Sequence, residues 1–509
     1  MVVVGAGHNG LVCAVRLAES GIPVTVLDQA PHPGGGVTSG EDTLPGFVHD
    51  HCAGFFPLTL ASPSFEGLRE SLDWENPPVA MAHPFVDGTA IALHRDVGAT
   101  VASLEAAAPG AGRAWAELID PLLAHREQVL RAALSPFPPL RPGLALAAAL
   151  RRDGVELARR MLASTASLGR ELFRDERATA WLSGSAMHGD ITPGAAGGAA
   201  FALFLNLLGH LVGWGFPRGG AGRLTDALVA RLVELGGELR CGASVESILV
   251  RDGRATGVRL RDEEEIAADA VVVGVSAGRL AAMLPARALP DRLTTRLRSW
   301  RYGLGTFKVD YALSDPVPWM SRDAREAGVV HVADTLPLLF RSHQEAGAGR
   351  VPAEPTLVVG QHTLHDRSRA PADRHTLYLY THVPQRLDVD EADVVERIER
   401  RLEAFAPGFR ALILARSVRS PQRLEAENPS LVGGDLAGGS FEIDQQLIFR
   451  PAPELFRGRT PLAGLYIAGA SVHPGGGVHG VSGTSAARML LADATLLGRA
   501  RSRVAGLRS

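Results

Sequence analysis

The sequence of 509 residues is poor in cysteine, with only Cys13, Cys52 and Cys241, which lie far apart. Three well-separated cysteines do not predict a disulfide framework. The lack of a Cys-x-x-Cys pair excludes the redox and zinc motifs built on that spacing. His362 and His365, in an expected strand-to-loop segment, are not spaced to converge on one ion, so we expect no metal site. This cysteine usage favours a reducing compartment, and we expect a cytoplasmic protein.

Lysine is nearly missing as well. Lys308 is the only lysine among 52 basic residues, and all the others are arginines. Arginine and lysine replace each other easily on a surface, but only lysine offers a compact ammonium whose pKa the surroundings adjust. Lys308 is therefore a candidate catalytic residue. An ion pair with Asp310, on the same face of the expected strand, is the alternative interpretation.

Neither sign of charge predominates, because the formal net charge is only −3. A chain so nearly neutral has no field that gathers nucleic acid, and we expect no nucleic-acid partner. Residues 191–216 carry no formal charge at all. This run is long enough for a transmembrane helix. Its glycines and Pro193 instead favour a buried helix or the wall of a substrate tunnel, with loose peripheral membrane contact as a further expectation.

What the sequence does contain is a dinucleotide-binding opening. Val2–Val4 predicts a strand, Gly5-Ala6-Gly7-His8-Asn9-Gly10 a glycine turn, and residues 11–18 a closely packed helix. In such a turn the first glycine permits the bend, the second lets a pyrophosphate approach the backbone, and the third allows close helix packing. Asp28 ends a second short strand, where it is placed to accept a hydrogen bond from a ribose hydroxyl. An acid there argues against a 2′-phosphate and hence against NADP.

Two further glycine-rich segments favour FAD over NAD. Pro33-Gly34-Gly35-Gly36 closely follows Asp28, as in flavoproteins that run a loop back along the cofactor, with a plain turn as the alternative. Near the C-terminus, an expected strand over 464–468 leads into Gly469-Ala470 and then into a loop with Gly475-Gly476-Gly477-Val478. Bare backbone in that loop lets a flavin ring lie close to the chain.

Along the chain, segments with this nucleotide-binding pattern alternate with segments of two other sequence patterns. Residues 64–218 are rich in Ala, Leu and Arg and predict helices, whereas alternating runs between 300 and 385 predict an antiparallel sheet. We therefore expect an α/β fold in which a Rossmann-like FAD-binding domain is interleaved with an α+β substrate domain. The FAD-binding domain comprises residues 1–63, 217–299 and 421–509, and the substrate domain comprises residues 64–216 and 300–420.

These motifs together resemble the phytoene desaturase-like FAD-dependent oxidoreductases, within the wider amine oxidase or flavin-containing superfamily. Besides the opening, the resemblance rests on residues 44–50 (LPGFVHD), 219–224 (GGAGRL), 428–435 (NPSLVGGD) and 473–478 (HPGGGV). It covers most of the chain and is weakest between about 70 and 180. The resemblance implies non-covalently bound FAD, and it implies a backbone contact from Val245 to the adenine end.

The motifs and the resemblance define a set of expected site residues. The cofactor-binding residues are Gly5, Ala6, Gly7, His8, Asn9, Gly10, Asp28, Gln29, Gly35, Gly36, Val245, Gly469, Ala470, Gly477 and Val478. A stretch similar to that around Lys308 carries, in monoamine oxidases, a lysine that holds a water against flavin N5, which implies the same role here. Thr38 is a departure, because the family often has an arginine near this place. The amine oxidase branch often has an acid after the tail glycine. This chain has Ala470 there, which resembles the desaturase branch.

We therefore expect an enzyme that transfers a hydride from an apolar or polyene-like substrate to flavin N5, with reoxidation by oxygen or a quinone. The alternatives are an amine oxidase, a flavin-binding interaction protein with little turnover, and isomerisation at the same flavin site. His188 is either a cavity residue or a satisfied core histidine. His51-Cys52 is considered for covalent flavin attachment but lacks supporting partners in the sequence. His473 and His479 are candidates for contact with the ring or the substrate.

Overall fold

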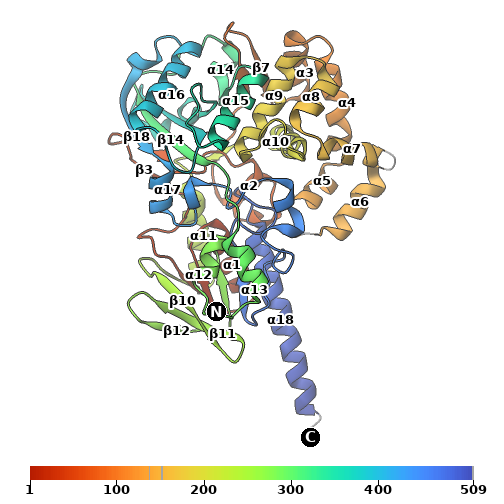
Figure 1. Cartoon of the computed structure of the whole chain (residues 1–509), viewed down its shortest axis with the longest axis vertical. Coiled ribbons are helices and arrows are strands. Elements are labelled where there is room, and N and C mark those ends of the chain that lie inside the picture. The colour runs from red at the N-terminus through yellow and green to blue at the C-terminus, as the bar shows by residue number, and fades with distance from the viewer. Residues whose placement is uncertain (137, 151–152, 507–509) are drawn as a thin grey trace.

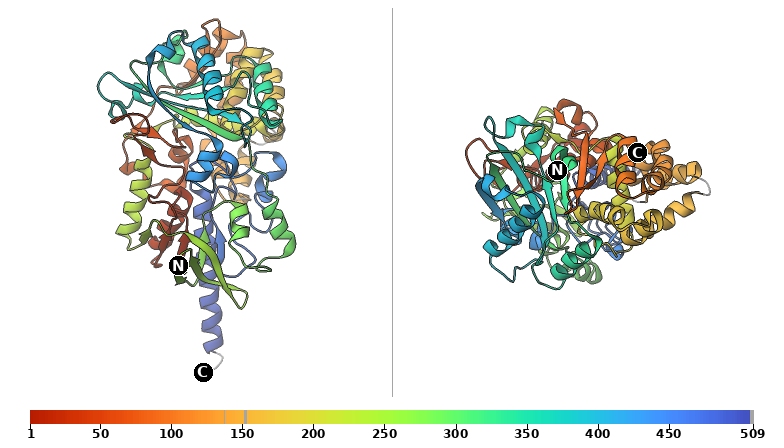
Figure 2. Two further views of the ribbon diagram at one scale, coloured as in Figure 1. Left: turned by 60° about the vertical axis from the view of Figure 1, so that its left-hand side comes forward. Right: turned by 90° about the horizontal axis from the view of Figure 1, so that it is seen from above.

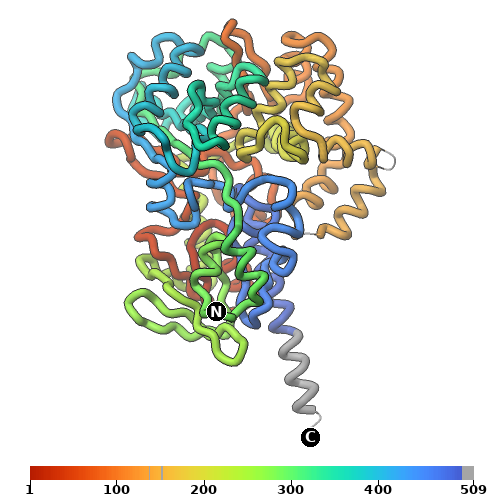
Figure 3. Tube along the Cα trace, viewed as in Figure 1, coloured from red at the N-terminus to blue at the C-terminus, as the bar shows by residue number. Residues whose placement is uncertain are grey.

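The computed structural model describes residues 1–136, 138–150 and 153–506. Two lobes are stacked along the long axis of the molecule (Figure 1, and from the side in Figure 2). The start of the chain, its middle near residue 250 and its part after about residue 460 lie side by side in the lower lobe (Figure 3). The chain therefore passes between the lobes more than once.

The lower lobe is built on a five-stranded sheet whose neighbouring strands are all parallel. From edge to edge its strands are β19 (Leu465–Ile467), β13 (Val271–Val273), β1 (Val2–Val4), β2 (Thr25–Leu27) and β9 (Glu238–Arg240). The valines of β1 and β13 are buried throughout. Continuous apolar strands of this kind are typical of a parallel sheet with covered faces.

The helices that pack in this lobe include α1 (His8–Glu19), α11 (Gly222–Glu234) and α18 (Val481–Gly506). At Gly483 of α18, a Cβ atom would lie 2.1 Å from the backbone oxygen of Asn9 in α1. Only glycine therefore allows these two helices to approach so closely, and this contact joins the end of the chain to its beginning.

A separate antiparallel sheet of three strands contains the predicted hairpin. Its strands are β10 (Val245–Arg251), β11 (Arg254–Leu260) and β12 (Glu265–Ala267). Asp252 and Gly253 both have positive φ, 49° and 70°. These angles are those of a tight hairpin turn, so the Asp-Gly prediction is confirmed.

The upper lobe is built on a seven-stranded sheet. In spatial order the strands are β18 (Ile413–Arg419), β14 (Gly305–Leu313), β17 (His375–Val383), β16 (Leu357–Gly360), β15 (Ala327–Val332), β6 (Val79–Pro84) and β7 (Ala90–His94). All neighbours are antiparallel except β15 and β6. The antiparallel sheet predicted for residues 300–385 is confirmed.

Helices cover both faces of this sheet. One face of the sheet packs against several helices. They include α3 (Val97–Ala107), α4 (Ala111–Ala124), α8 (Thr165–Phe173), α9 (Glu176–Ala186), α10 (Gly198–Leu211) and α15 (Leu336–Gly347). The other face packs against α14 (Arg322–Glu326) and α16 (Glu391–Phe405). Outside these layers, α5 (Arg126–Ala133), α6 (Leu140–Leu150) and α7 (Asp153–Leu162) form an extension visible at the right of Figure 1.

The prediction of helices throughout 64–218 is wrong for residues 79–94, which form β6 and β7. Every residue of β6 is buried. A strand buried on both faces lacks the alternation of apolar and polar residues that distinguishes a strand from a helix in a sequence. Its partner strand β15 follows about 250 residues later in the chain. Tertiary packing therefore decides the structure of this segment.

The uncharged run 191–216 contains α10, most of which is buried in the upper lobe. Among the residues that the structure describes, no helix is both long and apolar enough to cross a membrane. The two domain ranges expected from the sequence stay a prediction. The strands of the five-stranded sheet lie in residues 2–27, 238–273 and 465–467, and those of the seven-stranded sheet in 79–94 and 305–419.

Candidate active site

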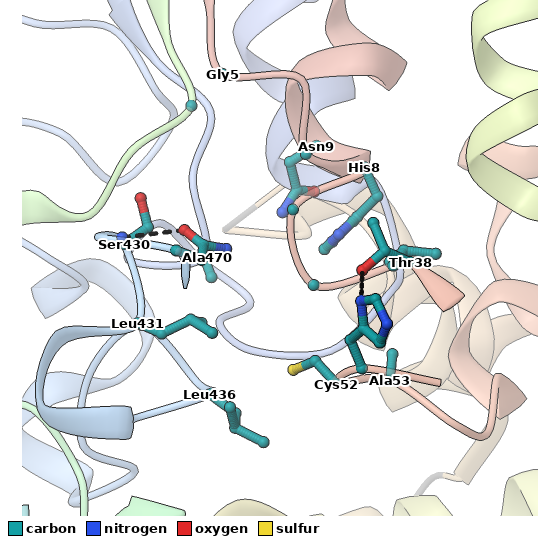
Figure 4. Close-up of a pocket in the computed structure, with 18 of the residues that line it drawn as sticks. Gly5, His8, Asn9, Thr38, Cys52, Ala53, Ser430, Leu431, Leu436 and Ala470 are labelled. Atoms are coloured by element: carbon teal, nitrogen blue, oxygen red, sulfur yellow. Dashed lines mark hydrogen bonds between the residues drawn. The ribbon is translucent and has the colours of Figure 1, made fainter. Parts of the chain in front are cut away.

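A cavity of about 1160 Å³ lies between the lobes and is lined by residues of both. In the close-up of Figure 4, His8 and Asn9 at the start of α1 lie with Cys52 and Ala53 on one side, opposite Leu431 and Leu436. This volume is slightly above the range of about 300–1000 Å³ that is typical of a pocket for one drug-sized ligand, so the cavity suits a large ligand such as a dinucleotide.

The glycine turn after β1 has the geometry that a dinucleotide requires. Gly5 has φ +99°, and a Cβ on Gly10 would lie 2.0 Å from the carbonyl oxygen of Gly5, so neither position accepts a side chain. Gly7 differs, because a Cβ there would meet no atom within 4 Å, and Gly7 lines the cavity. Open space beside this backbone, at the N-terminus of α1, suits a pyrophosphate.

Asp28 lies at the end of β2 and braces this turn. Its Oδ2 accepts a hydrogen bond from Ala6 N–H at 2.6 Å, and its Oδ1 accepts from Ala30 N–H at 2.8 Å. Asp28 and Gln29 also line the cavity, whereas Ala6 is not among the lining residues. Asp28 therefore positions the turn, in addition to the predicted contact with a ribose.

The second glycine loop lies directly on the first. Gly34 N–H donates to the carbonyl of Ala6 at 2.9 Å, and a Cβ on Gly35 would lie 3.2 Å from the Cα of Gly7. Gly35 and Gly36 line the cavity. The two loops thus form one continuous wall, as expected for a loop that runs back along the cofactor.

The C-terminal segment closes the same cavity. Gly469, Ala470, Gly477 and Val478 all line it, and a Cβ on Gly469 would lie 2.4 Å from the carbonyl of Val275. Val245, carried over from the resemblance, also lines the cavity, at the start of β10. Except for Ala6, the structure brings all the expected cofactor-binding residues to one cavity; that they bind FAD stays a prediction.

Several buried polar atoms in this region fit a ligand. His8 Nε2, Asn9 Oδ1 and Ser276 Oγ have no hydrogen-bond partner among the described residues, and all three residues line the cavity. Burial and the nearby His479 lower the pKa of His8 to about 3, so its ring is neutral. Unsatisfied buried polar groups are costly. A cofactor with phosphate and hydroxyl groups matches these atoms, and the glycine walls leave room for it.

Sequence reasoning missed Ser276. It follows β13, whose neighbour in the sheet is β1, and parallel strands deliver ligand-binding residues at their carboxyl ends. The sequence predicts a buried strand at 270–275. The position of Ser276 directly after this strand was therefore the feature that could have predicted its place in the site. The arginines that line the cavity, Arg261, Arg279, Arg419 and Arg423, carried no such signal, because arginine is abundant throughout the chain.

Thr38, which stands near the place of the family's arginine, belongs to a polar network at the cavity wall. Its Oγ1 and His51 Nδ1 are 3.0 Å apart, and His51 Nε2 lies 3.0 Å from Asp42 Oδ2. Arg419 reaches Asp42 at 3.0 Å. The charge of Arg419 therefore reaches the cavity from β18, and it is balanced by Asp42.

Lys308 is buried on the face of the large sheet that carries the cavity. It is in register with Tyr380 of β17 and with Arg419 of β18. Its ammonium makes an ion pair with Asp310 and lies 4.5 Å from the ring centre of Tyr378. Tyr378, Tyr380 and Arg419 line the cavity, whereas Lys308 is not among the lining residues. The ion pair with Asp310 is thus present, and the catalytic role of Lys308 stays a prediction.

The end of the cavity in the upper lobe is mostly apolar, with His188 as a polar residue in its wall. Helix α10 contributes Phe201 and Leu205, strand β16 contributes Val358, and strand β17 contributes the two tyrosines. The run 191–216 thereby forms part of the cavity wall. The aromatic residues of β17 were missed, because nothing in an alternating strand tells which face meets a cavity.

The remaining histidine candidates have defined places. His188 lines the cavity, and its pKa is lowered to about 3, first by burial and then by His382. His479 is buried, with Nε2 2.9 Å from the carbonyl of Gly475, and its Nδ1 accepts from Val481 N–H. His473 precedes a cis proline and has a pKa lowered to about 3, mainly by burial. Neither His473 nor His479 is among the residues that line the cavity.

Comparison with known proteins agrees with this geometry. Residues 10–491 match the family of flavin containing amine oxidoreductases. A hydroxyneurosporene desaturase of Cereibacter sphaeroides is 30% identical, with 97% of each chain covered. The pyridine nucleotide-disulfide oxidoreductase domain-containing protein 2 of Mus musculus is 27% identical, over 97% of this chain and 93% of the mouse protein.

The fold is shared with the solved structure of an oxidase. Cyclohexylamine oxidase from Brevibacterium oxydans superposes with a TM-score of 0.59 at 16% identity, over 97% of this chain and 99% of that one. The expected α/β fold with a Rossmann-like FAD domain is thus confirmed. The chain belongs to the flavin-containing amine oxidoreductase family, and it is an FAD-dependent oxidoreductase.

Proposed function

We propose that this enzyme desaturates an elongated apolar substrate of the polyene type, with a hydride passing to flavin N5 and with oxygen or a quinone as the final acceptor. The observation that carries the proposal is the continuity of a single cavity. It runs from the glycine turn at Gly7 to the apolar residues Phe201 and Leu205 of α10. A cofactor bound at one end therefore meets a substrate in apolar surroundings at the other.

The chemistry of the walls supports this substrate class. The cavity residues from α10, β16 and β17 are all aliphatic or aromatic (Phe201, Leu205, Val358, Tyr378 and Tyr380). Aromatic side chains bury large areas against an apolar ligand while the tyrosine hydroxyls keep a polar partner. The desaturase from Cereibacter sphaeroides, the most identical of the relatives compared above, points to the same class.

When bound, FAD supplies the two-electron acceptor for the reaction. The glycine turn and Asp28 hold the dinucleotide end, with His8, Asn9 and Ser276 as ligands for its polar groups. The aromatic walls orient the substrate and exclude water. Thr38, His51 and Cys52 form the wall between the two ends, and binding without a covalent link is part of the proposal.

The proposal is tested by anaerobic mixing of the FAD-loaded protein with a phytoene-type polyene in detergent micelles. We expect loss of the oxidised flavin absorbance and formation of a product with one more carbon–carbon double bond. A primary amine such as cyclohexylamine is run in parallel. Bleaching by the amine alone would replace the proposal with an amine oxidase. A flavin that neither compound reduces, but that dithionite does, would favour a binding protein with little turnover.

A further inference from the structure

Arg450 differs from the other deeply buried basic side chains of this protein. Arg369, Lys308 and Arg450 are each at most 1% exposed. Arg369 forms ion pairs with two buried carboxylates, and Lys308 forms one with Asp310. In the part of the chain that the structure describes, Arg450 makes no ion pair. Its charge is therefore buried without a carboxylate in contact.

The guanidinium of Arg450 instead donates to backbone carbonyls of two segments. Its Nη2 lies 2.7 Å from the carbonyl oxygen of Ala437, and its Nε and Nη2 lie 3.3 and 3.2 Å from that of Ala470. Two further bonds go to the carbonyls of Ser440 at 3.2 Å and Gly439 at 3.3 Å. Carbonyl oxygens satisfy the N–H donors but carry no net charge, so they hold the cation in place without neutralising it.

Both segments belong to the cavity wall beside the loop that is expected to hold the flavin ring. Ala437 and Ala470 line the cavity. A Cβ on Gly475 would lie 3.0 Å from Arg450 Nε, and a Cβ on Gly476 would lie 2.6 Å from the Cα of Ala437. The C-terminal glycine loop thus packs directly on the arginine and on the segment that it holds. Arg450 is not itself a lining residue, so its charge lies just behind the wall.

Arg450 carries its charge at neutral pH, whereas the histidines beside it do not. Burial lowers the pKa of Arg450 to about 10, which leaves the guanidinium protonated. Mainly through burial, with the charge of Arg450 adding to it, the pKa of His473 is lowered to about 3 and that of His479 to about 4. The ring centres of Trp300 and Phe441 lie 5.8 and 5.5 Å from the guanidinium carbon. A charge in such surroundings is costly, and a ligand that gains negative charge offsets the cost.

One carboxylate influences Arg450 without contacting it. Asp435 accepts hydrogen bonds from the N–H groups of Ala437 and Gly439, at 2.7 Å each, and its charge acts on Arg450. Asp435 thus holds the N–H groups of the same segment whose carbonyls Arg450 holds. The two side chains fix one part of the wall with opposite charges, so removing either charge has an opposite electrostatic effect on the cavity.

We propose that Arg450 is a positioning residue that fixes the wall beside the flavin ring, and that its unpaired charge raises the reduction potential of the bound FAD. A hydride brings two electrons and one proton, so the ring gains one negative charge when it is reduced. A cation fixed in a low-dielectric site stabilises charge that develops nearby. The proposal rests on FAD as the cofactor of this family and on the expected place of its ring beside residues 475–478. It does not depend on the polyene substrate.

The test is an anaerobic redox titration of the FAD-loaded full chain with dithionite and an indicator dye. Arg450→Gln removes the charge but keeps N–H donors, whereas Arg450→Lys keeps the charge. We expect Arg450→Gln to shift the equilibrium toward oxidised flavin at least about 10-fold, which lowers the potential of this two-electron couple by about 30 mV. Arg450→Lys should keep most of the wild-type potential, and Asp435→Asn should raise it. Arg457→Gln, at an exposed arginine of the same segment, is the matched control and should leave the potential unchanged.

Two outcomes would overturn the proposal. If Arg450→Gln raised the Kd for FAD and left the potential unchanged, Arg450 would serve the pyrophosphate rather than the ring. If Arg450→Gln and Asp435→Asn both lowered the potential, lost packing rather than lost charge would be the cause.

A measurement on the wild type covers the case in which the Arg450 variants do not fold. Its bound flavin should have a potential at least about 30 mV above that of free FAD in the same buffer. A potential at or below that of free FAD overturns the proposal. Because dithionite supplies the electrons, these results stand whether or not the polyene reduces the flavin, and failure of the polyene would count against the proposed function alone.

Discussion

Lys308 lies with its ammonium 4.5 Å from the ring centre of Tyr378, between the cavity wall and the carboxylate of Asp310. Both the lysine and the aspartate are about 1% exposed. Burial lowers the pKa of Lys308, and Asp310 opposes this shift. The only lysine of the chain is thus separated from the cavity by one aromatic ring.

Lys308→Met tests the structural and the catalytic role together. The substitution leaves the carboxylate of Asp310 buried, with Arg419 at 3.6 Å as its remaining cation. Removing one partner of a buried pair costs about 3–5 kcal/mol, and we expect that loss in the free energy of unfolding, measured in urea. Lys308→Met/Asp310→Asn, which removes both charges, is expected to recover most of it. In this double variant, a rate of flavin reduction about 100-fold below wild type would assign catalysis to Lys308; a wild-type rate would make it purely structural.

Gly7→Val is expected to weaken FAD binding without weakening the fold. A Cβ at Gly7 meets no protein atom within 4 Å but enters the cavity where the pyrophosphate is expected. We expect the Kd for FAD, measured by fluorescence titration, to rise at least about 10-fold, which is about 1.4 kcal/mol. Gly347→Val is the control, since Gly347 also has nothing within 4 Å and lies at the exposed end of α15. Equal FAD affinity in both variants would contradict the assignment of the turn.

The flavin is expected to be released intact when the protein is denatured. Cys52 lines the cavity, but burial raises the pKa of its thiol to about 11, so it is not a thiolate at neutral pH. His51 is engaged by Thr38 and Asp42. Heat precipitation followed by chromatography should place all of the FAD in the supernatant. Flavin that stays with the precipitate of the wild type but not of Cys52→Ser would show a covalent link through this thiol.

Arg369 is expected to be one of the most sensitive positions for stability. It donates to Asp50 at 2.6 Å, to Asp366 at 2.9 Å and to the carbonyl of Pro217 at 2.8 Å, all in buried surroundings. Arg369→Met leaves two buried carboxylates without their cation, and a loss of about 3–5 kcal/mol in the free energy of unfolding follows. Arg374→Met, on the exposed part of the same segment, should change it by less than about 0.5 kcal/mol. Similar losses in both variants would contradict this assignment.

His343 is expected to make stability depend on pH. Burial lowers the pKa of His343, but the hydrogen bond and charge of Asp190, at 3.2 Å, outweigh it, so the pKa is raised above 6.5. The stabilisation is therefore fully present below about pH 6.5, the value of the unfolded chain, and is lost as pH rises through the folded pKa. Because the pair is partly exposed, we expect at most about 1 kcal/mol. The free energy of unfolding is measured in urea at pH 6 and pH 8.5. We expect it to fall between these pH values in the wild type but not in His343→Gln. An identical pH dependence in both proteins would refute the role of the His343–Asp190 pair.

The dinucleotide end of the site is encoded locally, and the sequence by itself determined it. Gly5 has the positive φ and Gly10 the close packing that their spacing predicts, and Gly7 leaves open space beside the turn. The approach of a pyrophosphate to Gly7 stays a prediction. Asp28 follows from the same short unit. Its bond to Ala6 N–H was not predicted, because hydrogen bonds back to the turn depend on how the two strands pair.

At the apolar end of the cavity, the sequence predicted only the contribution of residues 191–216, and the tertiary structure decided the rest. Strand β6 was mistaken for helix because a fully buried strand has no alternation to read. Its pairing with β15 joins two segments that lie far apart in the chain. The same holds for Tyr378 and Tyr380, since alternation identifies two faces of a strand but not which face meets a cavity. Local sequence can specify a turn that binds phosphate, whereas a cavity between two lobes exists only once distant segments have packed.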